Sequence, residues 1–270
     1  MATYSRLIRR LMISSLTVVI SRALISPLLT LFLSNKLGLN PQDVGLLLGI
    51  AVFSATLLSL YGGYIIDRLD KRQLLILTML SSGVGLILLT FAQNLYWVTL
   101  VLIISETASA LFLICSKAIL SENLPVGQRV KAFSLNYTLT NIGYAVGPMI
   151  GVVIAGVQPS APFIVAGAIA IGSIFLLFGA VREVNPVAAV AQPQSFLKTL
   201  IILKNDRTMI LFTLGCLLST LVHGRFTLYL SQYLLVTHTQ QQTLDTMAAL
   251  LACNAITVIV LQYQIGRLLT

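Results

Sequence analysis

The sequence predicts an all-α polytopic membrane protein with eight transmembrane helices. Hydrophobic residues make up 57% of the 270 residues and charged residues only 9%, whereas soluble domains carry about 25% charged residues. The apolar residues fall into stretches of about 20, the length that crosses a bilayer. Lipid offers backbone polar groups no hydrogen-bonding partner, so each of these stretches must be a helix.

Eight segments fit this description. We expect spans at residues 11–33, 44–66, 74–92, 95–120, 132–157, 161–181, 209–236 and 247–265. Only Gln93 and Asn94 separate the third span from the fourth. Together those two spans are too long for one helix, so they predict a tight hairpin. The first span is too long for a cleaved signal peptide and lacks a small-residue cleavage site.

The lysines and arginines predict the orientation. With the N-terminus in the cytoplasm, 13 of the 17 lie on the cytoplasmic side and only Lys36 lies outside. The cytoplasmic cations are Arg6, Arg9, Arg10, Arg68, Lys71, Arg72, Arg129, Lys131, Arg182, Lys198, Lys204, Arg207 and Arg267. The net charge of +9 is therefore a topology signal, and we expect no nucleic-acid partner. Short loops and the lack of a targeting extension fit a bacterial inner membrane.

The longest connection divides the chain into domains. Residues 182–208 contain Pro186 and Pro193 and are predicted to be a cytoplasmic linker between a six-helix bundle, residues 1–181, and a partial C-terminal bundle, residues 209–270. Within this linker, residues 195–205 could form a short amphipathic helix at the membrane surface.

A short internal repeat relates the two parts. The tetrapeptide that ends with Ser34, near the end of the first span, has a similar counterpart that ends with Ser231, near the end of the seventh. A similar pattern ends the second and eighth spans, which favours parallel six-helix repeats. On this interpretation the chain contains one complete half and the first two helices of the second. Four further helices would then be expected, and the chain is expected to be a truncated form.

A charged motif follows the second span. The segment Gly63-Tyr-Ile-Ile-Asp67-Arg68-Leu-Asp-Lys71-Arg72 resembles the loop signature of the major facilitator superfamily, Gly-x-Leu-x-Asp-Arg-x-Gly-Arg-Lys. It departs from the signature at Asp70, which replaces a glycine. We expect Gly63 to let two helices approach closely. Asp67 is expected at a helix C-terminus, which disfavours an anion, so it needs cations or a helix N-terminus nearby and would act as a gate latch. A plain positive-inside loop is the alternative.

A glycine motif lies in the fifth span. Gly143, Gly147, Pro148 and Gly151 are similar to the antiporter signature of exporters in the same superfamily. Small residues at a spacing of four form a close-packing face, and Pro148 is expected to kink the helix. An ordinary packing groove is the alternative.

The two motifs lie at matching topological positions, so the chain resembles a proton antiporter of drugs or metabolites. The resemblance covers the whole chain. It implies the six-helix N-terminal half of a major facilitator fold plus the first two helices of the C-terminal half. It also implies a secondary transporter that exports small organic molecules by alternating access. The segment 133–143, with Arg22 and Lys117, resembles a subgroup of enterobacterial exporters of amino acids, dipeptides or drugs.

Charged residues within the spans are the candidate cavity residues. Arg22 in the first span and Glu106 in the fourth would each cost about 2.5–3.5 kcal/mol at the bilayer centre if unpaired in lipid. The resemblance implies that both helices line a central cavity. Our hypothesis is that Glu106 couples transport to protons and that Arg22 is its partner or binds a substrate carboxylate. The alternative is a purely structural pair.

Two further cations lie within spans. Lys117 is near the cytoplasmic end of the fourth span, where it either faces the cavity or extends its charged end toward the membrane surface. Arg225 in the seventh span is a candidate for lining the cavity from the second half. His223 is interpreted as an interior hydrogen-bonded residue. The cysteines, Cys115, Cys216 and Cys253, are expected to be packing residues.

Other function classes find no support in the sequence. It contains no nucleotide-binding loop, metal-ligand cluster or Ser/His/Asp arrangement, so we expect neither an enzyme nor a cofactor. The expected partners are a small-molecule substrate, protons and the lipid bilayer, and a second chain could supply the missing helices. The alternative function is a transport-incompetent fragment that acts as a packing or regulatory partner of another membrane protein. No motif favours a channel or an intramembrane enzyme.

Overall fold

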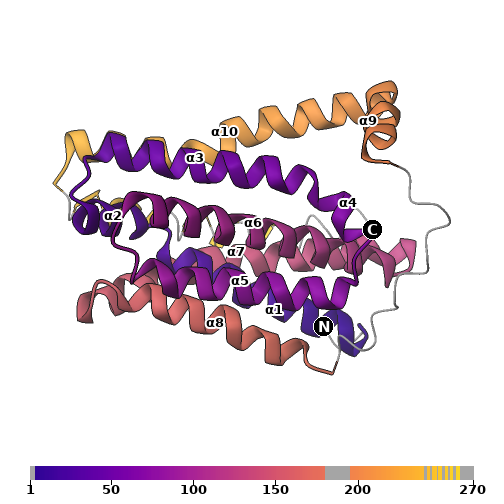
Figure 1. The fold of residues 1–270 in the computed structure, drawn as a ribbon, viewed down its shortest axis with the longest axis horizontal. Helices are drawn as coiled ribbons and strands as arrows, with labels where there is room; N and C mark the ends of the chain where they lie inside the picture. The colour runs from indigo at the N-terminus through magenta and orange to yellow at the C-terminus, as the bar shows by residue number, and fades with distance from the viewer. Residues whose placement is uncertain are drawn as a thin grey trace. The chain divides into compact units, whose positions relative to one another are not determined.

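The computed structural model describes most of the chain. The described residues are 4–179, 195–239, 242, 243, 245–247, 249, 250, 253, 254, 256, 257, 260 and 261. They form two compact units, one containing helices α1 to α8 and the other containing α9 and α10 (Figure 1). All elements in the described residues are helices, as the fold-class prediction requires. Each unit is described by itself.

The first unit contains eight helices. Their bounds are α1 Arg6–Ile25, α2 Leu29–Leu37, α3 Pro41–Leu60, α4 Gly62–Ile66, α5 Lys71–Leu89, α6 Leu95–Glu122, α7 Val126–Val157 and α8 Ala161–Leu177. In the described part of the chain, α3, α5, α6 and α7 are each long and apolar enough to cross a membrane, and α1 with α2 makes a fifth span if the bent pair counts as one. Two apolar helices, Ala161–Leu177 and Arg207–Ser219, are shorter. The predicted number of eight spans stays a prediction, and the eighth, 247–265, lies only in part within the described residues.

The first predicted span is broken, which corrects the expectation of one continuous helix. Helices α1 and α2 meet at an angle of 47°. Pro27 lies at the break and has no N–H to donate to a preceding carbonyl. The chain instead makes a turn in which the Leu28 N–H donates to the Ile25 carbonyl at 3.0 Å. Helix α2 then ends at Gly38, whose φ of 65° suits a left-handed helix cap.

The structure changes the prediction for the second span and confirms the hairpin between the third and fourth spans. The second span is divided at Tyr61 into α3 and the short helix α4. The hairpin between the third and fourth spans is confirmed, because α5 ends at Leu89 and α6 begins at Leu95. Asn94 begins α6 as an N-cap, its side-chain oxygen accepting from the Trp97 N–H at 2.9 Å.

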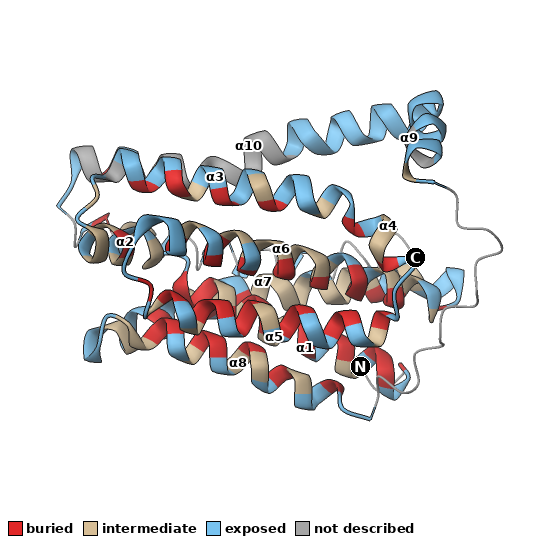
Figure 2. Cartoon of the chain, viewed as in Figure 1, coloured by how far each residue is buried: buried red, intermediate tan, exposed pale blue. Residues whose placement is uncertain are grey.

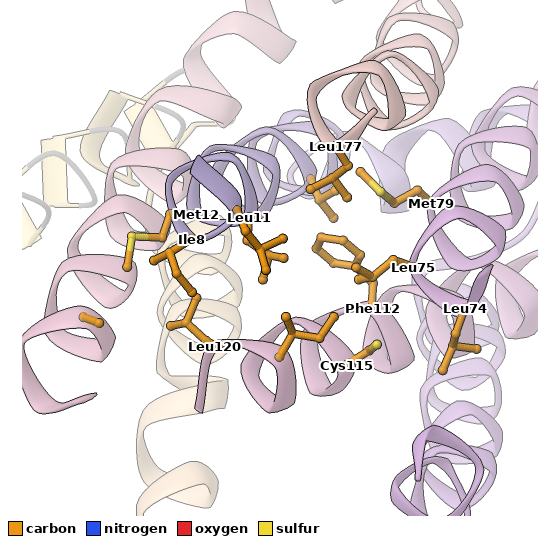
Figure 3. Close-up of a cluster of buried hydrophobic side chains, with 14 of the residues drawn as sticks. Ile8, Leu11, Met12, Leu74, Leu75, Met79, Phe112, Cys115, Leu120 and Leu177 are labelled. Atoms are coloured by element: carbon orange, nitrogen blue, oxygen red, sulfur yellow. The ribbon is translucent and has the colours of Figure 1, made fainter. Parts of the chain in front are cut away.

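Helix α1 is buried along most of its length in the first unit. It packs against α7 and α8, while α6 packs against α5 and α3. Figure 3 shows an apolar cluster in which side chains of α1, α5, α6 and α8 meet, among them Leu11, Met79, Phe112 and Leu177. Figure 2 shows buried residues along α1, α5 and α8 and mostly exposed ones along α3. The burial of α1 fixes the backbone that carries Arg22.

Buried serines join these helices by hydrogen bonds. Ser14 and Ser21 of α1 donate to α8, Ser21 reaching the Ala166 carbonyl at 2.7 Å. The hydroxyls of Ser82 in α5 and Ser109 in α6 lie 2.8 Å apart. Small polar residues let helix backbones approach closely and satisfy their hydroxyls between helices, as is usual in membrane bundles.

The second unit contains α9, Phe196–Asn205, and α10, Arg207–Thr237. The predicted short helix at 195–205 is confirmed as α9, with Ser195 as its N-cap accepting from the Lys198 N–H at 3.3 Å. Its position at a membrane surface stays a prediction. Helix α10 contains the predicted seventh span, 209–236, and Asp206 caps it by accepting from the Met209 N–H at 3.0 Å.

Candidate functional site

Arg22 and Glu106 form an ion pair between α1 and α6. An Arg22 Nη2 hydrogen is donated to Glu106 Oε2. The two side chains are 30% and 27% exposed, so the pair is partly buried and partly accessible. The sequence predicted this partnership because each charge would be costly if left alone in lipid. The pairing is confirmed, and its role in transport stays a prediction.

A serine pair joins the same two helices. The Ser15 and Ser116 hydroxyls lie 3.0 Å apart, and both residues are buried. Ser15 lies seven residues before Arg22, about two helical turns, so both side chains point from α1 to α6. The α1–α6 contact therefore contains one neutral and one charged polar interaction beside the apolar cluster that the two helices share.

Lys117 lies on the same side of α6 as Glu106. Eleven residues separate them, about three turns of helix. The Lys117 side chain is exposed and has no hydrogen bond or ion pair within the described part of the chain. The side chains of Arg225 and His223 lie outside the described residues. The structure therefore brings together two of the four predicted cavity residues.

The predicted latch residue Asp67 lies at the end of α4. It is the C-cap of that helix, where the macrodipole disfavours a negative charge, as expected. Its carboxylate is exposed and has no ion pair or hydrogen bond within the described residues. The latch role of Asp67 stays a prediction.

Other residues of the loop motif have partners in the first unit. The Lys71 ammonium pairs with the Glu122 carboxylate at the end of α6, and the Lys71 side chain is 9% exposed. The Arg68 guanidinium lies 4.2 Å from the centre of the Tyr64 ring. Asp70, which departs from the family signature, is the N-cap of α5. Its carboxylate accepts from the Arg72 N–H at 2.9 Å, so this residue begins a helix where the signature has a flexible glycine.

The close approach predicted at Gly63 is wrong in this unit. A Cβ atom at Gly63 would meet nothing within 4 Å. The neighbouring Gly62 is the close-packed residue, since a Cβ there would lie 2.4 Å from Leu111 Cδ2 of α6. Adjacent helical residues point about 100° apart, so only one glycine of this pair can face α6.

The antiporter motif packs directly on α1. Gly143, Gly147 and Gly151 are the buried residues in the second half of α7. Ideal Cβ atoms at these positions would lie 2.9, 2.5 and 1.9 Å from the nearest α1 atoms. The predicted close-packing face is confirmed, and α1 is its partner. Helix α7 continues through Pro148, and the predicted kink stays untested.

Sequence reasoning missed Glu122, Gly62 and the serine pair of α1 and α6. An acidic residue at the end of the fourth predicted span, on the side of the membrane where the sequence also predicts Lys71, was the available signal for Glu122. The double glycine was the signal for Gly62. Among the described residues, no group of histidine, cysteine and carboxylate side chains could hold a metal ion.

Comparison with known proteins identifies the family. The profile described as Major Facilitator Superfamily matches residues 11–270. The chain belongs to the Major Facilitator Superfamily. This confirms the resemblance drawn from the loop and antiporter motifs, and it makes the chain an integral membrane protein of a family of transporters, not of enzymes.

Several superfamily members are similar in sequence. The uncharacterized MFS-type transporter YdeE of Escherichia coli K12 is 30% identical over 258 residues, which are 95% of this chain and 65% of YdeE. The uncharacterized MFS-type transporter YqjV of Bacillus subtilis 168 is 25% identical, covering 88% of this chain and 59% of YqjV. The quinolone resistance protein NorA of Staphylococcus aureus is 27% identical over 55% of this chain and 38% of NorA. The chain thus spans less than two thirds of the length of these relatives.

A solved structure shares the fold. The POT family transporter PepTSo superposes with a TM-score of 0.60 at 17% identity, covering 98% of this chain and 55% of PepTSo. At this identity the likeness supports the fold alone. It agrees with a helical arrangement in which this chain corresponds to part of a longer superfamily transporter.

Proposed function

We propose that this chain acts in proton-coupled export of small organic molecules by alternating access. The observation that carries the proposal is the Arg22–Glu106 ion pair, which lies within the spans and is partly exposed. The predicted spans contain four charged residues. Glu106 is a carboxylate, and the other three, Arg22, Lys117 and Arg225, are cations. Intramembrane ionisable residues of this kind usually serve substrate or proton pathways.

The pair suggests a simple coupling step. A proton that binds a Glu106 carboxylate oxygen neutralises it and removes the electrostatic attraction to Arg22. The guanidinium is then available to a substrate carboxylate or to other acceptors. When the proton leaves, the pair re-forms and the bound anion is displaced. Drugs, amino acids and dipeptides are the candidate substrates, and the quinolone resistance protein NorA supports the first class.

The cytoplasmic loop motif supports a gate in the proposed cycle. Asp67 carries a negative charge at a helix C-terminus, a position that is stabilised when a cation or a helix N-terminus comes close. We assign Asp67, with Gly63, Arg68, Lys71 and Arg72, to a latch that favours the state closed to the cytoplasm. In this assignment the N-terminus is cytoplasmic and the membrane is a bacterial inner membrane.

A second candidate function is suggested by the length of this chain relative to its relatives. The chain spans 65% of YdeE, and the proposed boundary at 181 leaves a six-helix bundle, a linker at 182–208 and a partial bundle at 209–270. In this candidate the chain does not transport by itself and packs with, or regulates, another membrane protein that could supply further helices.

Inverted membrane vesicles test the two candidates. A pH-sensitive dye would report the collapse of a proton gradient when amino acids, dipeptides or a quinolone are added. The chain is compared with a version extended by the remaining helices of YdeE, and each with its Glu106→Gln variant. Substrate-dependent proton movement in the chain itself, lost in Glu106→Gln, supports transport. Movement only in the extended version supports the second candidate, and none in either overturns the proposed coupling.

A further inference from the structure

The glycine face of α7 meets α1 at the turns that carry Arg22. A Cβ atom at Gly143 would lie 2.9 Å from Val19 Cγ1, and one at Gly147 would lie 2.5 Å from the Ala23 Cβ. Both distances are well below the 3.4 Å at which ordinary contact begins. Any side chain at Gly147 therefore requires α1 and α7 to separate, because Ala23 has no flexible end that could move aside.

The third glycine meets α1 at the break in the first span. A Cβ atom at Gly151 would lie 1.9 Å from the Leu24 carbonyl oxygen. The Leu28 N–H, which would bond to that oxygen in a continuous helix, donates instead to the Ile25 carbonyl at 3.0 Å. The Leu24 carbonyl thus leaves the helical pattern where it approaches α7, and a hydrogen atom on Gly151 is all that fits between the two backbones.

Helix α1 presents a different face to α6. Val19 and Ala23 are four residues apart and share the side toward α7, whereas Arg22 lies about 100° away from Ala23 on the side toward α6. Ser15 lies on the α6 side as well. Close-packed helices transmit a displacement at one face to the other. The position of α1 against α7 therefore determines how its α6 side meets Glu106.

We propose that Gly143, Gly147 and Gly151 are positioning residues for the Arg22–Glu106 pair. By admitting α1 against α7 without intervening side chains, they set the position of α1 relative to α6 at which the pair forms. This role lies within the first unit and does not depend on transport. It links the antiporter motif to the intramembrane charges through direct backbone packing.

A cross-link between α1 and α6 measures this position without altering the ion pair. The full 270-residue chain, with Cys115, Cys216 and Cys253 changed to alanine, would carry Ser15→Cys and Ser116→Cys. The two serine hydroxyls lie 3.0 Å apart, so the cysteines are close enough to bridge. The rate of disulfide formation with a membrane-permeant oxidant, in lipid nanodiscs, reports the α1–α6 separation.

Matched glycine variants then give the test. Gly147→Ala should slow the cross-link about tenfold, because a shift of about 1 Å moves the cysteines toward the limit of disulfide geometry. Gly156→Ala is the control in the same helix, since a Cβ there meets nothing within 4 Å, and it should leave the rate unchanged. Adding Ala23→Gly to Gly147→Ala removes the closest clash but leaves the Leu24 nitrogen at 3.0 Å and the Ala23 carbonyl carbon at 3.1 Å, so it should restore part of the rate. If Gly147→Ala cross-links as fast as the same double-cysteine chain without a glycine substitution, the proposal is overturned.

A second cross-link separates positioning from general loosening. Ser82 and Ser109 join α5 to α6 with hydroxyls 2.8 Å apart, away from the glycine face. Cysteines at these positions should bridge at the reference rate in Gly147→Ala, and slowing of both cross-links overturns the proposal. If Gly147→Ala fails to accumulate, Gly143→Ala replaces it, because its clash is with a Val19 methyl group. Slowing of the α1–α6 cross-link in Gly143→Ala supports the positioning role, and an unchanged rate overturns it.

Discussion

The Arg22 guanidinium donates to the Glu106 carboxylate across the contact between α1 and α6, and both side chains stay roughly one quarter to one third exposed, at 30% and 27%. A fully buried pair would be hard to open, and a fully exposed one would add little to stability. The intermediate burial suits a pair that contributes to the fold and can also be opened by a proton or a ligand.

Removing one partner of this pair is expected to destabilise the bundle more than removing both. Glu106→Gln leaves the Arg22 charge without its carboxylate, and the expected loss is about 1–3 kcal/mol, below the range for fully buried pairs because the side chains are partly exposed. The double variant Arg22→Gln/Glu106→Gln removes both charges and should recover most of the loss. Thermal unfolding in nanodiscs measures both. A double variant as unstable as Glu106→Gln would contradict a direct charge pairing.

Lys36 in α2, whose side chain bonds to the end of α5, provides a second stability test. Its ammonium donates to the Leu89 carbonyl at 3.2 Å and to the Thr90 carbonyl, at the C-terminus of α5, where a cation is favourable. Lys36→Met keeps most of the stem but loses both bonds, so the expected destabilisation is about 1–2 kcal/mol. Amide hydrogen exchange should speed up selectively at residues 86–92.

Lys117→Met is the matched control for Lys36→Met. It removes the same ammonium from an exposed lysine that has no ion pair or hydrogen bond in the described residues. Its effect on the unfolding free energy should stay within about 0.5 kcal/mol. Equal losses in the two variants would show that the Lys36 bonds to α5 do not stabilise the bundle.

The sequence was most informative where one residue in the wrong environment would cost much free energy. An isolated charge in lipid must find a partner, so Arg22 and Glu106 could be paired before their positions were known. The helix end at Asp67 and the hairpin at Gln93 and Asn94 followed from equally local chemistry. The superfamily itself was recognisable because two motifs occurred at the expected topological positions.

Details that depend on three-dimensional contact could not be predicted. The choice between Gly62 and Gly63 depends on which of the two adjacent residues faces α6. A helix that is apolar on all sides has no pattern of polar and apolar residues from which that face could be predicted. Pro27 could have ended or merely kinked the first helix, and its effect depends on what α2 packs against. The Lys71–Glu122 pair joins the first residue of α5 to the last residue of α6, whose proximity only the fold determines.

The orientation can be tested on single-cysteine variants of a chain without native cysteines. The distribution of cations places Gln128 in the cytoplasm and Asn94 outside. In intact cells a membrane-impermeant maleimide should label a cysteine at Asn94 and leave one at Gln128 unlabelled until the membrane is permeabilised. The reverse pattern would invert the proposed topology, and with it the assignment of the Asp67 motif to a cytoplasmic gate.

Asp67→Asn is expected to change gating without changing stability. The Asp67 carboxylate is exposed and makes no hydrogen bond or ion pair in the described residues, so its loss should alter the unfolding free energy by no more than about 0.5 kcal/mol. If Asp67 stabilises the state closed to the cytoplasm, its neutralisation should open that side more often. A cysteine in place of Lys117, near the predicted cytoplasmic end of α6, should then react faster with a water-soluble maleimide.

The alkylation rate should rise about threefold or more, because a loss of about 0.7 kcal/mol in the closed state is enough to change a population by that factor. The measurement is made on the chain extended by the remaining helices of YdeE, where a second half is present to close the gate. Asp43→Asn is the control, since it removes a carboxylate from the first turn of α3, at the opposite end of that helix from the motif. An unchanged rate in Asp67→Asn, in protein of normal stability, would contradict the gate role and leave Asp67 as an ordinary charge of the loop between α4 and α5.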